Sequence, residues 1–153
     1  MSIGFLAAAG LVTSASALTV KKKIEIGASP DKVWSSVGDF CGIAAWHPAV
    51  AKCELSDKDG KVYRTLTLKG GGTIVERQNS RNDAKRMYSY SIIESPLPVT
   101  DYASTIRVKG SSKTSTVTWE GRFKAKGAPK EKAIEVVSGI YEAGLKGIAE
   151  KSQ

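Results

Sequence analysis

The side chains best suited to chemistry begin with a single histidine. His47 is the only histidine among the 153 residues, and an imidazole can exchange protons near neutral pH. It stands directly before Pro48, and the sequence shows no nucleophile or carboxylate at a spacing that would complete a triad. His47 is therefore either an acid–base group or a structural residue at a corner of the chain, and both interpretations stay open.

Two charged residues lie in stretches that alternate between polar and apolar positions, as half-buried strands do. Arg64 shares a face with Leu66, so an inward Arg64 would need an acidic partner such as Glu76 or an anionic ligand. Around Glu76 both faces are mixed. Alternation alone therefore leaves open whether this carboxylate points into a pocket or toward solvent.

A group of tyrosines shows a clearer inward face. Tyr88 and Tyr90 alternate with serines, and Tyr102 and Ser104 alternate with residues of the opposite face. The pattern predicts a tyrosine-rich interior. Such an interior suits an aromatic or isoprenoid ligand, and ordinary core packing explains it almost as well.

The elements that must position these residues follow from the periodicity of the apolar residues. We expect a long helix at residues 128–150 and short helices beginning at residue 30 and at residue 43. Turn residues separate the expected strands, which are 18–27, 50–55, 61–69, 73–80, 86–94, 102–108 and 114–125. Short connections between neighbouring strands favour antiparallel pairing. The sequence therefore predicts an α+β domain in which a curved sheet covers one amphipathic helix.

The long helix has an unusual apolar face. Val136 and Ile140 lie on this face, but so does Gly144, where a side chain would be expected to fill the core. Such a gap can accept a neighbouring backbone or leave room for a ligand. We expect it to leave room for a ligand.

Composition narrows the classes of function. The net charge of +8 is spread along the chain, with no basic run interleaved with aromatic residues, so we expect no nucleic-acid partner. Cys41 and Cys53 either form a disulfide or are two buried thiols. Two cysteines and a single histidine are an unfavourable ligand set for a zinc site. We expect no metal and no cofactor.

The N-terminus differs in character from the rest of the chain. Residues 3–12 are apolar and small, and Ala15-Ser16-Ala17 has the form of a cleavage site, although the basic start of a secretory signal is missing. We expect residues 1–17 to be a signal peptide, residues 18–153 to be one domain, and the protein to be periplasmic or secreted. The segment is too short for a stable membrane anchor. The alternative is a short N-terminal helix or strand packed on the domain.

Several segments, taken with the order of the elements, resemble the START/Bet v 1 (SRPBCC) superfamily. They are residues 29–34, Trp46-His47-Pro48, residues 72–77, Tyr88-Ser89-Tyr90, residues 96–99 with Tyr102, and Val117-Thr118-Trp119. Within the superfamily, residues 18–150 are similar to bacterial polyketide cyclase/dehydrase-like proteins, including exported MxaD-type proteins. The resemblance implies a helix-grip fold, in which seven antiparallel strands curl around the C-terminal helix with an apolar cavity between them.

The resemblance also implies roles for individual residues. Glu76, Tyr102 and Ser104 match in type the residues that organise water in the pocket of plant abscisic acid receptors. Glu120 corresponds to a second pocket glutamate, although a bulge would be needed to turn it inward. His47 stands where those receptors carry a lysine that binds the ligand carboxylate. Residues 69–72 and 95–99 correspond to the gate and latch loops of those receptors but do not reproduce their motifs. The resemblance therefore does not imply a hormone-dependent switch in this protein.

We therefore expect a cavity between the sheet and the long helix, with His47 and Glu76 at its polar end. The candidate ligand-binding residues are His47, Arg64, Leu66, Glu76, Tyr88, Tyr90, Tyr102, Ser104, Glu120, Val136, Ile140 and Gly144. The favoured function is non-catalytic binding or carriage of a small hydrophobic molecule, such as an aromatic, lipid or isoprenoid. The alternatives are an enzyme of the cyclase/dehydratase type using the same cavity, and an exported accessory protein acting through an unidentified protein partner.

Overall fold

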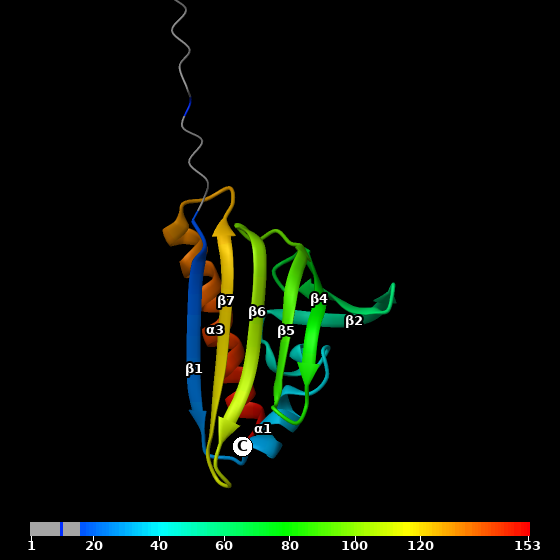
Figure 1. Ribbon diagram of the computed structural model, residues 1–153, viewed down its shortest axis with the longest axis vertical. Helices are drawn as coiled ribbons and strands as arrows, with labels where there is room; N and C mark the ends of the chain where they lie inside the picture. The colour runs from blue at the N-terminus through cyan, green and yellow to red at the C-terminus, as the bar shows by residue number, and fades with distance from the viewer. Residues whose placement is uncertain (1–9, 11–15) are drawn as a thin grey trace, which may run out of the picture.

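The computed structural model describes residue 10 and residues 16–153 (Figure 1). Its elements follow the predicted order of one strand, two short helices, six strands and one long helix. They are β1 (Leu18–Ile26), α1 (Pro30–Val37), α2 (Ile43–Trp46), β2 (Val50–Lys58), β3 (Lys61–Leu68), β4 (Thr73–Asn82), β5 (Met87–Glu94), β6 (Val99–Gly110), β7 (Ser115–Ala125) and α3 (Lys130–Lys151).

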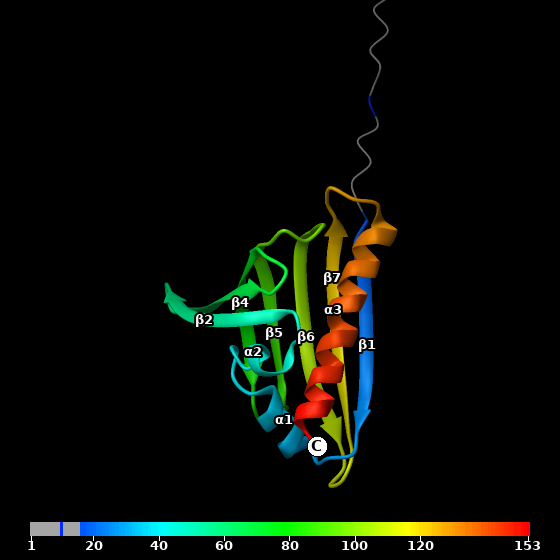
Figure 2. The same cartoon turned by 180° about the vertical axis from the view of Figure 1, so that it is seen from behind.

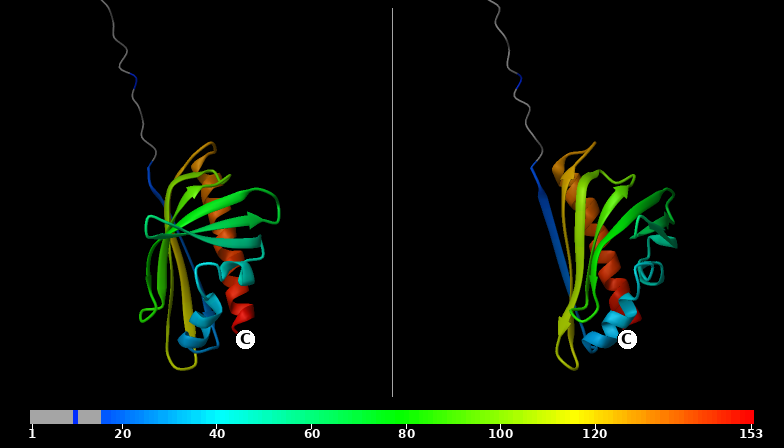
Figure 3. Two further views of the ribbon diagram at one scale, coloured as in Figure 1. Left: turned by 90° about the vertical axis from the view of Figure 1, so that its right-hand side faces the viewer. Right: turned by 45° about the vertical axis from the view of Figure 1, so that its right-hand side comes forward.

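All seven strands form one antiparallel sheet in the order β1-β7-β6-β5-β4-β3-β2. The first strand therefore pairs with the last, and β2 forms the other edge. The sheet curls around α3, which runs along β7 and β1 on its concave side (Figures 2 and 3). The helix-grip fold expected from the sequence is confirmed.

Helix α1 begins where its capping residues predict. The Ser29 side chain accepts a hydrogen bond from the Lys32 N–H, and Pro30 occupies the first helical turn. The helix ends at Val37, and the capping residue Gly38 has a φ of 72°, which favours glycine. Its apolar stripe places Val33 and Val37 fully inside the core.

Strand β6 begins three residues earlier than the alternation of the sequence predicts. Its register with β7 shifts between Thr100 and Ala103, and Asp101 adopts a positive φ of 51°. This irregularity has the character of a β-bulge, which breaks the two-residue period on which the sequence prediction relied. The strand therefore extends beyond the regular pattern that begins at Tyr102.

The structure joins Cys41 and Cys53 in a disulfide, with their Cα atoms 5.5 Å apart. The bridge ties the chain after α1 to β2 and closes a loop that contains α2. Of the two alternatives that the sequence left open, the disulfide is the one present. A loop of this size contributes about 3 kcal/mol when the bridge is unstrained.

The signal peptide expected over residues 1–17 lies almost wholly outside the described residues. β1 begins at Leu18, the residue that follows the expected cleavage site. Within the described part of the chain, no helix is long and apolar enough to cross a membrane.

We predict that the mature protein starts at Leu18, because cleavage after Ala17 would leave the whole of β1 in place. N-terminal sequencing of protein recovered from its host measures this directly. A chain that still begins at Met1 or Ser2 would contradict the prediction.

Candidate functional site

A cavity of about 210 Å³ lies between the sheet and α3. Strands β3 to β7 form one wall, α3 forms the opposite wall, and α2 with the start of β2 closes one side. Leu97, from the loop between β5 and β6, completes the lining. The lining residues are Ile43, His47, Ala49, Val50, Leu66, Leu68, Ile74, Glu76, Tyr90, Ile92, Leu97, Tyr102, Trp119, Val136, Val137 and Ile140.

The structure brings most of the candidate residues together at this cavity. Those that line it are His47, Leu66, Glu76, Tyr90, Tyr102, Val136 and Ile140. Ile92 was missed, although it shares the inward face of Tyr90 and the alternation of β5 indicated it. Ile74 was also missed, because it shares the face of Glu76, whose direction alternation left open. Leu97 and Ala49 belong to irregular segments, and no periodic pattern pointed to them.

Other candidates lie away from the cavity. Tyr88 is buried behind it, against Trp34 and Phe40. Ser104 is also buried, but it contacts the hydroxyl of Tyr141 instead of the cavity. In both cases an inward-facing side chain packs against aromatic residues of the protein and does not line the cavity.

Glu120 is on the opposite face of the sheet. The register of β7 with β6 is regular on both sides of this residue, so no bulge turns its side chain inward. Trp119 and Gly121 occupy the inward positions, and the Glu120 carboxylate lies 3.7 Å from the Lys21 ammonium on the outer surface. The expectation that Glu120 faces the pocket was wrong.

Gly144 does not open the cavity, and the expectation of a notch was wrong. A Cβ atom at Gly144 would lie 2.5 Å from Cζ3 of Trp119 and 2.8 Å from Cδ2 of His47. The Trp119 ring is itself stacked on Tyr141, with ring centroids 4.5 Å apart. The missing side chain therefore gives space to packed aromatic rings of the protein instead of to a ligand.

His47 lines the cavity, but its two ring nitrogens are both engaged by the backbone. Nε2 lies 2.9 Å from the Ile140 carbonyl oxygen, which can only accept, and Nδ1 accepts the Ala49 N–H at 3.1 Å. These contacts require the neutral ring with its proton on Nε2. His47 thus lies at a corner of the chain, as one of the two interpretations held, and its contacts also connect α3 to the segment between α2 and β2.

The environment of His47 predicts a pH dependence of stability. Burial lowers the pKa of His47 below the ordinary value of about 6.5, and the positive charge of Arg64 lowers it further. The hydrogen bond to the Ile140 carbonyl oxygen raises the pKa and offsets part of this shift. The unfolded chain therefore binds a proton at His47 more readily than the folded chain. This contribution to stability is present above pH 6.5 and is lost as pH falls toward the folded pKa.

We expect the unfolding free energy from urea titrations to fall between pH 7 and pH 5 by up to about 1.4 kcal/mol per pH unit from this group. His47→Gln should show a shallower fall over the same range. Equal pH slopes in the two proteins would show that His47 does not resist protonation.

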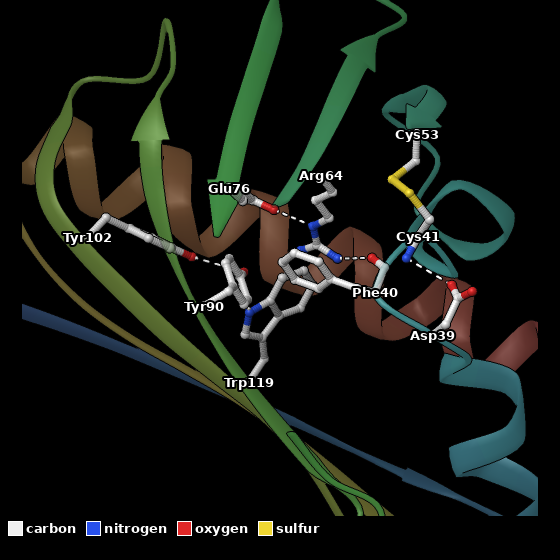
Figure 4. Close-up of polar contacts among 9 residues, drawn as sticks. All are labelled: Asp39, Phe40, Cys41, Cys53, Arg64, Glu76, Tyr90, Tyr102 and Trp119. Atoms are coloured by element: carbon white, nitrogen blue, oxygen red, sulfur yellow. Dashed lines mark hydrogen bonds and ion pairs between the residues drawn. A yellow bond between two sulfur atoms is a disulfide. The ribbon is translucent and has the colours of Figure 1, made fainter. Parts of the chain in front are cut away.

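Arg64 and Glu76 form an ion pair beneath the cavity (Figure 4). Nε of Arg64 lies 2.5 Å from Oε2 of Glu76, Nη1 donates to the Phe40 carbonyl oxygen, and the guanidinium carbon lies 4.0 Å from the centre of the Phe40 ring. Arg64 is fully buried and does not line the cavity, whereas Glu76 does. Of the two partners considered for an inward Arg64, the structure shows Glu76.

The charges of this pair depend on each other. Burial opposes the Arg64 charge, but the Glu76 carboxylate beside it holds the pKa of the guanidinium above its ordinary value. Burial also raises the pKa of Glu76, and the charge of Arg64 opposes that shift. Because the guanidinium keeps its proton throughout the physiological range, Glu76 remains ionised as its counter-charge.

A chain of hydrogen bonds begins beside this ion pair, because the Tyr90 ring lies 4.9 Å from the guanidinium carbon of Arg64. Figure 4 shows its members Trp119, Tyr90 and Tyr102. The Trp119 indole N–H donates to the Tyr90 hydroxyl at 3.0 Å, and the Tyr90 and Tyr102 hydroxyl oxygens are 3.3 Å apart. Tyr102 in turn contacts the Tyr141 hydroxyl, which lies 2.9 Å from Oγ of Ser104. Burial raises the pKa of Tyr90 and Tyr102 well above 10 and that of Tyr141 to about 12. All three remain hydroxyls at neutral pH.

The fold and this cavity agree with a comparison against known families. Residues 17–153 match the family described as polyketide cyclase / dehydrase and lipid transport. The chain belongs to this family. The match covers every element of the fold, so the whole described domain is the family's SRPBCC-type, ligand-binding fold.

Two solved structures resemble the chain closely. XoxI from Bacillus cereus is 39% identical, with a TM-score of 0.81, over 86% of this chain and 93% of that chain. An uncharacterized protein from Bacillus thuringiensis is 38% identical, also with a TM-score of 0.81, over 87% of this chain and 97% of that chain. A search of curated proteins found no match.

A more distant structure shares the fold alone. The Zhui aromatase/cyclase from Streptomyces sp. R1128 is 18% identical, with a TM-score of 0.73, over 90% of this chain and 94% of that chain.

Within residues 16–153, no group of three His, Cys, Asp or Glu side chains is placed to hold a metal ion.

Proposed function

We propose that the protein binds a small hydrophobic molecule in the cavity between the sheet and α3. The observation that carries the proposal is the cavity itself, about 210 Å³ in volume and lined mainly by aliphatic and aromatic side chains. Such a lining, with a few fixed polar groups, is typical of small-molecule sites. Membership of a family described by cyclase, dehydrase and lipid-transport members supports the same conclusion.

The volume limits the size of the ligand. An engineered core cavity of about 150 Å³ binds benzene, and sites for drug-sized molecules begin near about 300 Å³. The cavity therefore suits one or two fused rings or a short branched chain. A longer lipid would have to extend out of the cavity or move its walls.

Two observations favour binding over the alternative functions. Both ring nitrogens of His47 are held by backbone atoms, which leaves this histidine without a proton-transfer role toward a ligand. The large apolar side chains exposed within the described residues are Leu55, Ile93 and Ile134, and they lie on three different elements. They do not mark one protein-binding patch.

A titration with indene, an apolar bicyclic molecule, tests the proposal. We expect saturable shifts of the methyl NMR signals of Leu66 and Ile140, with a dissociation constant in the micromolar to millimolar range expected for so few atoms. Val136→Phe should fill part of the cavity and weaken binding at least tenfold. Ile134→Phe, a matched substitution at an exposed position of α3, should leave it unchanged. Equal binding by both variants, or no binding to the unmodified protein, would refute the proposal.

A further inference from the structure

The direction of each hydrogen bond at the cavity can be assigned from the two ends of the hydroxyl chain. At one end, Oγ of Ser104 lies 3.0 Å from the Glu120 carbonyl oxygen, which can only accept. Ser104 therefore uses its proton there, and the Tyr141 hydroxyl must donate to Ser104. Tyr141 then has no proton left, so the bond between Tyr102 and Tyr141 is donated by Tyr102.

The same reasoning continues to the other end. Because the Tyr102 proton is used, the bond between Tyr90 and Tyr102 must be donated by Tyr90. The Trp119 indole, which can only donate, closes the chain by giving its proton to Tyr90. Each hydroxyl thus donates once and accepts once. No hydroxyl proton is left to point into the cavity, but Tyr90 and Tyr102 each keep an unused lone pair.

The other donors that line the cavity are also engaged. His47 gives its Nε2 proton to the Ile140 carbonyl oxygen, and the Ala49 N–H is given to His47. The Leu97 N–H bonds to Oγ of Ser95. The side-chain donors that line the cavity are therefore all committed to acceptors of the protein itself.

Glu76 adds a strong acceptor to this surface. Its Oε2 receives the Arg64 Nε proton, and within the described residues its Oε1 takes part in no hydrogen bond. Glu76 lines the cavity while Arg64 lies behind it. A ligand in the cavity thus meets an almost wholly apolar wall in which Glu76 supplies the acceptor, and it meets no free N–H or O–H of a side chain.

From this polarity we infer that the cavity selects a neutral, compact hydrophobic molecule that carries a hydrogen-bond donor, such as a phenol, an alcohol or an indole-type N–H. The inference rests on the proposed function and names the chemical class of its ligand. A molecule with only acceptors gains nothing from this surface, and a carboxylate would face Glu76 without any donor to offset the repulsion.

The charge of the ligand follows from the ion pair. Arg64 already balances Glu76 at 2.5 Å. An ammonium group would add an unbalanced positive charge to a site enclosed by apolar side chains, where desolvation of a charge is costly. A neutral donor satisfies the free carboxylate oxygen without this cost.

Three bicyclic molecules of nearly equal size test the inference on the unmodified protein. Indole, benzofuran and indene carry N–H, oxygen and CH₂ at the same ring position. In methyl NMR titrations we expect the dissociation constant of indole to be at least about tenfold lower than that of benzofuran. The reason is that only indole can donate a hydrogen bond to the charged acceptor. Dissociation constants within threefold of one another would overturn the donor preference while leaving the proposed function intact. Failure of all three to bind would overturn both.

A single substitution gives a second, independent test. In Tyr102→Phe the Tyr90 proton loses its acceptor and becomes available to the cavity. Benzofuran should then bind several-fold more tightly, indene should bind as before, and the ratio between indole and benzofuran should shrink. A purely structural effect of the substitution would weaken all three alike. An unchanged ratio would overturn the assigned hydrogen-bond directions.

Discussion

Glu76→Gln is expected to destabilise the protein by about 3–5 kcal/mol, because it leaves the buried Arg64 charge without its counter-charge. The glutamine keeps the shape of the side chain, and it can still accept one hydrogen bond from Nε of Arg64. It cannot balance a guanidinium that is fully buried among Phe40 and Tyr90. The unfolding free energy from urea denaturation measures the effect.

Two further variants separate charge from shape. Glu135→Gln makes the same chemical change in an exposed pair with Lys132, and it should alter stability by less than about 0.5 kcal/mol. Arg64→Met combined with Glu76→Gln removes both charges and should recover much of the lost stability. If Glu76→Gln alone is as stable as the unmodified protein, Arg64 must have found another counter-charge, and the account of this ion pair fails.

Gly147→Ala should also be strongly destabilising, by about 2 kcal/mol or more, although alanine favours helix over glycine. A Cβ atom at Gly147 would overlap the carbonyl oxygen of Trp46. That oxygen belongs to the backbone of α2, which the disulfide and the His47 contacts hold in place. Because the backbone of α2 cannot move without disturbing these contacts, the added side chain would force α3 away from α2.

Gly139→Ala provides the matched control on the same helix. A Cβ atom at Gly139 meets nothing within 4 Å, so its only effect should be a gain in helix propensity of up to about 1 kcal/mol. Thermal or urea unfolding of the two variants should therefore shift in opposite directions. A stabilised Gly147→Ala protein would mean that the contact between α2 and α3 is looser than described.

The sequence by itself determined the order of the elements and the fold class. A two-residue alternation marked inward faces such as Tyr88, Tyr90 and Ile92 on β5, and a Ser-Pro cap placed the start of α1. These signals are local, since each depends on residues only a few positions apart. Where the local period was interrupted, as by the bulge at the start of β6, the boundary was displaced.

The tertiary structure alone decided which residues share the cavity and what they can do there. Alternation shows that a side chain points inward, but not which neighbour from a distant strand covers it. For this reason Tyr88 and Tyr90 share a face, yet only Tyr90 reaches the cavity. The sequence also could not show what fills the space beside Gly144. The rings of Trp119 and His47 occupy it, and they come from segments far away in the chain.

The roles of the polar residues were likewise beyond the sequence. His47 was a candidate for acid–base chemistry until contacts with Ile140 and Ala49 showed both its nitrogens engaged. Glu76 was ambiguous until its pairing with Arg64 fixed its face and its charge. Hydrogen bonds and ion pairs depend on distances of about 3 Å between atoms of separate elements. Those distances exist only once the sheet has closed around α3.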